Sequence, residues 1–179
     1  MPTTTILETP RLILREFTLD DAPALLRMCS EPAIIRYTGD PPTVTTLDDA
    51  RANMLARPLA DYAKHGYGRW ACVLKETGEV IGFAGLKVLD DLNEVDLGYR
   101  FFPEHWGKGL ATEAARPVLD YGFTRLKLPR IIALAEPENV ASVRVLEKLG
   151  MAYAGTMEYR GCTVAKYVLQ ISTITSASH

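Results

Sequence analysis

The chain has 179 residues, of which 47% are hydrophobic and 23% are charged, as is usual for a globular domain with one core. A formal net charge of −2 gives no general attraction to nucleic acid or to an anionic membrane. No apolar run approaches the ~20 residues of a membrane span, and the N-terminus lacks the basic and apolar regions of a signal peptide. We therefore expect one cytoplasmic domain over residues 1–179, with its core at about 9–171 and with no nucleic-acid or membrane partner.

The cysteines are Cys29, Cys72 and Cys162, which are odd in number and far apart in the chain. Their spacing does not match a metal site, and no local motif marks one of them as a nucleophile. We expect three reduced cysteines and no bound metal.

The N-terminal part predicts one strand and two helices. Residues 1–10 resemble a loose lead-in, whereas 11–17 has the composition of a strand. Residues 18–21 offer N-cap candidates for a helix to about Ser30. A loop is expected at 38–45, and a second helix at 47–57 that ends before Pro58. The segment 61–68 fits no element.

The following part predicts a largely antiparallel sheet with two more helices. Residues 69–75 and 79–89 form a hairpin signal around the turn 76–79, and 94–102 adds a third strand. Later strands are expected at 130–135, 153–160 and 163–171, the last two around Gly161. From composition and periodicity alone, the fold class is a mixed α/β domain.

The most informative stretch contains Trp106-Gly107-Lys108-Gly109, which leads into a helix that reaches about Leu126. The apolar residues of this helix recur at the spacing of one face: Ala111, Ala114, Ala115, Val118 and Leu119. Glycines before a helix let the backbone approach a ligand, and the first turn leaves N–H groups unpaired. This arrangement favours a phosphate or pyrophosphate site.

Three glycine-loop chemistries compete for this stretch. A nucleotide P-loop requires Lys-Ser/Thr after its last glycine, but Leu110 and Ala111 follow Gly109. A dinucleotide fingerprint requires a third glycine where this chain has Thr112. The third is the acyl-CoA loop of GNAT acetyltransferases, Arg/Gln-x-x-Gly-x-Gly/Ala, which residues 106–111 resemble with Trp106 in the first place. A tight turn that only starts a helix is the alternative.

A second motif strengthens this resemblance. Residues 139–151 resemble the Asn-x-x-Ser-x-x-x-x-Glu-Lys-x-Gly-Phe signature of the RimJ/RimL-type branch of that superfamily, and 9–15 resembles its opening strand. The resemblance covers roughly residues 9–169. It implies an α+β GNAT fold, with a mixed, mostly antiparallel sheet flanked by helices.

The resemblance also implies an activity, the transfer of the acetyl group of acetyl-CoA to a primary amine by direct attack in a ternary complex. The acceptor is a protein N-terminus or a small-molecule amine. The cofactor-binding residues that it implies are Tyr99, Phe101, Trp106, Gly107, Lys108, Gly109, Leu110, Ala111, Thr112, Asn139 and Ser142. In the branch, the matching Asn contacts the pantetheine arm and the matching Ser stabilises the thiolate. Helix capping is the alternative for Asn139.

The general base is expected on the third strand of the hairpin series. Residues 95–99 resemble the family's Glu-Ile-Gly-Tyr stretch, which puts Asp96 where the branch often has Glu. Asp has a shorter reach and an ordinary pKa of ~4, so a base here needs a raised pKa or a water relay. Asp96 is equally expected to be a sheet-surface carboxylate or to bind the acceptor amine, and Glu94 and Glu136 are the substitutes. A further departure is Pro117, inside the predicted helix.

The acceptor side of the cleft is the least determined part. Candidate lining residues are Arg36, Tyr37, Tyr62, His65 and Tyr67, although ordinary surface positions are the preferred interpretation. Two other functions remain open: an acyl-CoA-binding regulatory module without turnover, and a transferase of another acyl group. The oligomeric state is expected to be a monomer or a homodimer.

Overall fold

A computed structural model describes residues 3–38 and 43–171. Its strands form one eight-stranded sheet in the order β1-β2-β3-β4-β5-β6-β8-β7, antiparallel at every pair except β5–β6. The strands are β1 Thr5–Glu8, β2 Leu12–Arg15, β3 Arg69–Leu74, β4 Val80–Leu89, β5 Glu94–Phe101, β6 Arg130–Ala135, β7 Ala152–Tyr159 and β8 Cys162–Gln170. This architecture confirms the mixed, mostly antiparallel α+β fold.

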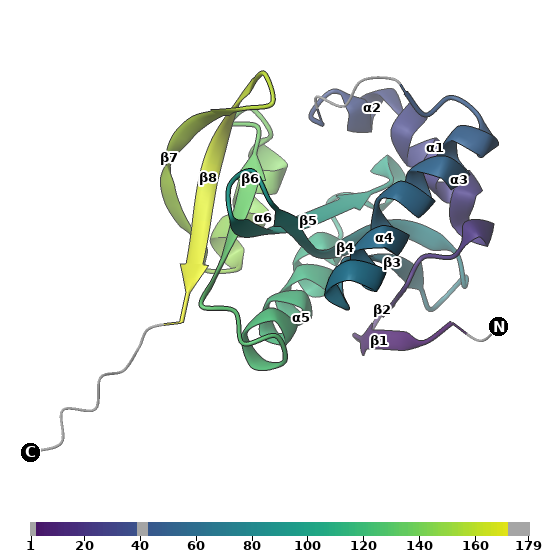
Figure 1. Ribbon diagram of the computed structural model, residues 1–179, viewed down its shortest axis with the longest axis horizontal. Helices are drawn as coiled ribbons and strands as arrows, with labels where there is room; N and C mark the ends of the chain where they lie inside the picture. The colour runs from purple at the N-terminus through teal and green to yellow at the C-terminus, as the bar shows by residue number, and fades with distance from the viewer. Residues whose placement is uncertain (1–2, 39–42, 172–179) are drawn as a thin grey trace, which may run out of the picture.

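The helices cover both faces of this sheet. They are α1 Ala22–Ser30, α2 Pro32–Ile35, α3 Leu47–Ala56, α4 Pro58–His65, α5 Leu110–Thr124 and α6 Val140–Lys148, with short 3₁₀ turns at Leu19–Asp21 and Pro103–His105. Figure 1 shows β6–β8 with α6 on one side of the molecule, β1–β4 with α1–α4 on the other, and β5 between them. No helix among the described residues is long and apolar enough to cross a membrane.

Two apolar clusters lie on opposite faces of the sheet. The larger joins α5 and α6 to the strands and includes Leu86, Leu97, Phe101, Val118 and Ile131. The smaller joins α1 and α3 to the other face and includes Phe17, Met28, Met54, Phe83 and Phe102. Because successive side chains of a strand point to opposite faces of the sheet, the strands contribute residues to both clusters.

Helix α5 follows its predicted pattern. Its buried residues include Ala114, Ala115, Val118 and Leu119, whereas Ala111 is half-buried. Gly122 brings the helix close to β6, because a Cβ there would lie 2.6 Å from the Cδ1 atom of Ile131. Pro117 lies well inside the helix, beyond its first turns.

The N-terminal part contains three elements beyond the predicted strand and two helices. The lead-in contains a strand, since Thr5–Glu8 pairs with β2. A short helix, α2, follows α1 directly after the break at Glu31. Pro58 ends α3 but also begins α4, because proline is tolerated in the first turn of a helix. The segment 61–68 that fitted no element therefore lies mostly in α4.

The remaining predicted elements agree with the structure to within a residue or two at most ends. The predicted loop at 38–45 includes residues 39–42, and the polar end is 172–179; both lie outside the described residues. Cys29, Cys72 and Cys162 form no disulfide with one another, and Cys72 is buried.

Candidate active site

The glycine loop holds a left-handed backbone at Gly107 (φ 71°) and at Gly109 (φ 76°), the N-cap of α5. The indole Nε1–H of Trp106 donates to the carbonyl oxygen of Phe101 at 2.7 Å, which fastens the loop to the end of β5. Within the described part of the chain, the amides of 107–112 donate no hydrogen bond. The loop therefore presents free N–H donors at the positive end of a fifteen-residue helix.

Sequence reasoning missed a second cation beside this loop. A Cβ on Gly109 would lie 3.7 Å from an Nη atom of Arg11. Glu113, in the first turn of α5, holds Arg11 in place by accepting from its backbone N–H at 2.9 Å and from Nε at 2.7 Å. Burial favours a higher pKa for Glu113, but hydrogen bonds from Thr9 and Arg11 outweigh it and the pKa is lowered. Arg11 is ion-paired with Glu113 at 2.6 Å, so it offers guanidinium N–H donors beside the loop, whereas Lys108 adds positive charge.

The sheet opens beside β5. Strands β5 and β6 share one register pair, Asp96 with Ile132. Beyond it, the N–H of Leu134 donates to the side-chain Oδ1 of Asp96 at 3.3 Å. The carboxylate therefore replaces a strand partner at the point where the ladder stops, and the following edges of β5 and β6 diverge.

Asp96 is buried at this opening, with 7% of its surface exposed. Its Oδ2 lies 3.3 Å from an Nη atom of Arg69, at the start of β3. Gly98 makes room for this guanidinium, because a Cβ there would lie 2.7 Å from the Arg69 Nε. Burial raises the pKa of Asp96 to about 6 although the charge of Arg69 opposes this shift. A carboxyl group with this pKa is able to exchange protons near neutral pH.

Tyr99 and Ser142 meet across the opening from β5 and α6. Their hydroxyl groups are 2.9 Å apart, and the Tyr99 hydroxyl also donates to the backbone oxygen of Ser142 at 3.1 Å. Burial raises the pKa of Tyr99 to about 12, so the phenol stays protonated. Asn139 caps α6 by accepting from the Ser142 N–H at 3.2 Å, as its capping alternative predicts. The pairing of the Tyr99 side chain with Ser142 is not apparent from the sequence, which indicated Tyr99 only as part of a strand end.

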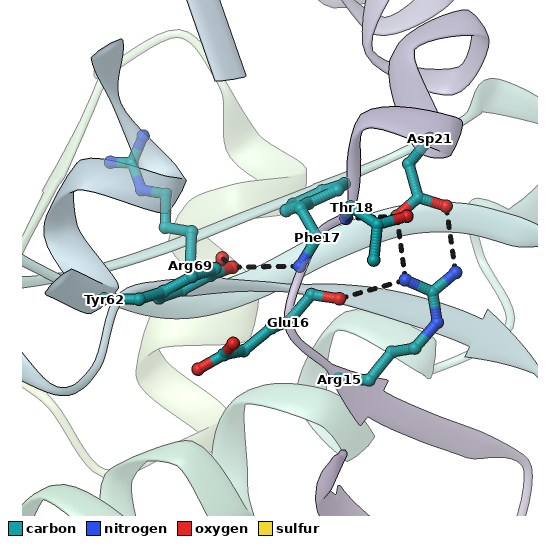
Figure 2. A network of polar contacts seen from close by, with 7 residues as sticks. All are labelled: Arg15, Glu16, Phe17, Thr18, Asp21, Tyr62 and Arg69. Atoms are coloured by element: carbon teal, nitrogen blue, oxygen red, sulfur yellow. Dashed lines mark hydrogen bonds and ion pairs between the residues drawn. The ribbon is translucent and has the colours of Figure 1, made fainter. Parts of the chain in front are cut away.

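A polar network behind the site fixes Arg69 (Figure 2). The Tyr62 hydroxyl, from α4, accepts from the Phe17 N–H at 3.2 Å and donates to the backbone oxygen of Arg69. Nearby, Arg15 makes two hydrogen bonds to Asp21, at 2.7 and 2.9 Å. Tyr62 therefore joins α4 and Phe17, which follows β2, to the first residue of β3, and its half-buried ring packs against the larger apolar cluster.

The other candidates lie in different surroundings. Glu94 is buried and paired with Arg130 and Lys166, which leaves it little freedom as a base. Phe101 and Leu110 are buried in the core on the α5 face. Among the acceptor candidates, Tyr67 is buried, Arg36 stacks over the Tyr37 ring at 5.2 Å, and His65 lines a surface hollow. Glu136 is half-buried, and Thr112 and Ala111 lie in the first turn of α5.

Comparison with known proteins agrees with this geometry. A family model described as an acetyltransferase (GNAT) domain matches residues 11–152. The chain is 37% identical over 153 residues to the uncharacterized N-acetyltransferase p20 of Bacillus licheniformis, covering 84% of each chain. It is 38% identical over 78 residues to the spermidine N(1)-acetyltransferase of Escherichia coli K12, covering 41% of this chain and 42% of that one.

Among solved structures, RimL, a ribosomal L7/L12 alpha-N-protein acetyltransferase in complex with coenzyme A, superposes with a TM-score of 0.81. That match has 19% identity and covers 94% of this chain and 98% of the other, so it shows the shared fold. The fold and the family match define an N-acetyltransferase of a family that uses acyl-CoA. The chain belongs to the GNAT acetyltransferase family, in its RimJ/RimL-type branch.

Proposed function

We propose that this protein transfers the acetyl group of acetyl-CoA directly to a primary amine, with Asp96 as the general base. The observation that carries the proposal is the place of Asp96: a buried carboxylate with a pKa of about 6 where β5 and β6 part. A base with a pKa near the working pH combines a useful ionised fraction with a useful affinity for protons. This feature supports turnover over a module that only binds the cofactor.

The free amides of 107–112 hold the pyrophosphate, with Lys108 adding charge and Arg11 adding guanidinium N–H donors. The open edges of β5 and β6 offer backbone donors and acceptors to the amides of the pantetheine arm. An N–H of β5 near Tyr99 supplies the oxyanion donor that acyl transfer requires. These residues bind and orient the thioester in the opening, with Asn139 at its side.

The two faces of β5 have different roles in the reaction. Side chains alternate along a strand, so Asp96 lies on one face and Tyr99 on the face that packs with α5 and α6. Asp96 takes the proton from the attacking amine, directly or through a water. As the new C–N bond forms and the C–S bond breaks, the Ser142 hydroxyl accepts from the Tyr99 O–H and donates its own hydrogen bond to the departing thiolate.

The first test is unfolding temperature with and without acetyl-CoA and CoA, followed by thiol release with a panel of amines and peptides. Ligand at 100 times its dissociation constant stabilises a protein by about 2.7 kcal/mol, which gives a measurable shift. We expect a shift with both ligands and thiol release with at least one amine. Stabilisation without release on any amine would overturn the transferase proposal and favour a binding module, and no stabilisation would overturn the cofactor site.

A further inference from the structure

A hollow of about 360 Å³ lies on the Asp96 side of the sheet. It is bounded by the junction of α3 and α4, by the end of β4 and its following turn, and by the tip of the β7–β8 hairpin. Its volume is within the range of small-molecule sites. Lys87 on its floor is the direct cross-strand partner of Asp96, so the hollow adjoins the proposed base.

Lys87 is a half-buried ammonium group without an ion pair to any described residue. Burial lowers its pKa, and the charges of Arg69 and Arg57 lower it further. Arg160 acts in the same direction more weakly, and Asp61 opposes them. Lys87 therefore lies in a local excess of positive charge, which an anion would relieve.

The acidic residues around the hollow leave this excess in place. Asp90 lies 3.4 Å from Lys64, and Asp91 lies 3.9 Å from Arg160. Asp61 is therefore the one remaining carboxylate of the described lining that faces both Arg57 and Lys87. The part of the lining around Lys87 and Arg57 therefore keeps a net positive charge.

Arg69 lies near Lys87 but is not among the residues that line the hollow. Its Nε is buried and finds no hydrogen-bond partner, the one such side-chain atom among the described residues. Its only ion pair among them is the 3.3 Å contact with Asp96. This Nε packs against Gly98, where a Cβ would lie 2.7 Å from it, so Arg69 acts on Lys87 through its charge and not through a contact in the hollow.

We propose that the acceptor is an amine that also carries a carboxylate, and that Lys87, with Arg57 in the same lining, binds that carboxylate in this hollow. The inference rests on the proposed transferase function and names its substrate class. A carboxylate at Lys87 leaves the amine of the same small molecule near Asp96 across the strand pair. A polyamine, by contrast, meets the cations Lys87 and Arg57 here. The carboxylate comes from a free amino acid or from an acidic residue at a peptide N-terminus.

Turnover tests the charge preference. Thiol release is measured with amino acids and their carboxamides, with peptides that begin with an acidic residue or its amide, and with spermidine. We expect carboxylate acceptors to be preferred and spermidine to be a poor acceptor. Loss of the Lys87 charge also raises the pKa of Asp96, so the assay is run well above pH 6, where Asp96 stays ionised. There Lys87→Gln should raise KM for the carboxylate acceptor about tenfold, with kcat little changed and the carboxamide unaffected. Lys127→Gln, at an exposed lysine outside the hollow, is the matched control.

Binding tests the same site without turnover. N-acetyl amino acids are added to the CoA complex beside N-acetyl amino acid amides, and the unfolding temperature is measured. We expect only the free carboxylates to raise the unfolding temperature of the wild type. This rise should be lost in Lys87→Gln and retained in Lys87→Arg. Equal shifts with acid and amide, or a Lys87→Gln enzyme that discriminates as the wild type does, would overturn the carboxylate site. Absence of thiol release on every amine would instead overturn the transferase proposal, and the binding arm would still decide the site.

Discussion

The two faces of β5 carry opposite chemistry. On one face, Leu97 and Phe101 pack under α5 in the larger apolar cluster. On the other face, Asp96 lies beside Arg69 and opposite Lys87. Side chains are buried on both faces. On the first face, burial removes apolar surface from water and stabilises the fold. On the second face, burial shifts the pKa values of ionisable groups. The same strand therefore provides both a rigid support and a site with shifted pKa values, and the substitutions below separate the two contributions.

The largest expected effect is on the polar face. Asp96→Asn keeps the shape and the acceptor for the Leu134 N–H but removes the proton acceptor. General-base catalysis is typically worth about 10²–10⁴-fold, so we expect kcat for thiol release to fall by that range. CoA-induced stabilisation should be unchanged. Asp120→Asn, at an exposed carboxylate of α5, is the control, and a kcat near wild type for Asp96→Asn would remove Asp96 as the base.

The apolar face should respond in stability instead of rate. Leu86 on β4 is 0% exposed in the cluster under α5. Leu86→Ala should lower the free energy of unfolding by about 2–5 kcal/mol, because it removes buried methyl groups and leaves a cavity. Denaturant unfolding measures this loss, and KM for acetyl-CoA below the transition should stay near wild type. A large KM change with little loss of stability would contradict the division between the faces.

A smaller effect is expected where β5 meets α6. Ser142→Ala removes the hydroxyl placed for the departing thiolate, and Tyr99→Phe removes its hydrogen-bond partner. We expect kcat to fall by about 10- to 150-fold in Ser142→Ala, since a hydrogen bond to a charged group is worth about 1.5–3 kcal/mol. Tyr99→Phe should lose about tenfold or less, because it removes a hydrogen bond between neutral groups, worth about 0.5–1.5 kcal/mol. The double variant should lose less than the product of the two, because both changes break one interaction. Ser30→Ala, at an exposed hydroxyl, is the control, and fully multiplicative losses would contradict a shared role.

The smallest effect is a shift in pH dependence. The Arg69 charge lowers the pKa of Asp96 against its burial, so Arg69→Gln should raise that pKa and move the acid limb of kcat/KM upward by about one pH unit. Gly98→Ala should act in the same direction, because its Cβ would lie 2.7 Å from the Arg69 Nε and displace the guanidinium. If the acid limb of kcat/KM does not move in either variant, Arg69 does not influence the pKa of Asp96.

Much of the fold could be predicted, because its signals are local. The strands from Arg69 to Phe101 alternate between clear turns, and α5 repeats its small apolar residues at helical spacing. Strand β1 could not be predicted, since an edge strand of four residues depends on its partner β2 for hydrogen bonds. Helix α4 was missed because Pro58 was interpreted as a stop, although the same residue also starts a helix.

The site residues that belong to a sequence motif could be predicted. The residues that only strand pairing brings together could not. The glycine loop and the residues Asp96, Asn139 and Ser142 were all indicated by motifs in the sequence, although their roles remain proposals. Arg69 reaches Asp96 only through the β3–β4–β5 register and the absence of a side chain at Gly98. Lys87 meets Asp96 by the same register. No local pattern in the sequence contains such long-range pairings.

The most direct test of the account is the pH dependence of kcat/KM for the wild type and Asp96→Asn with one acceptor. The carboxylate form is the active one, so wild-type activity should rise as the pH increases through about 6, the raised pKa of Asp96. Ionisation of the acceptor amine affects both enzymes alike, so the difference between their profiles isolates the carboxylate. The account predicts that the limb near pH 6 disappears in the variant. An identical limb in both enzymes would contradict it, because the proton acceptor would then be another group.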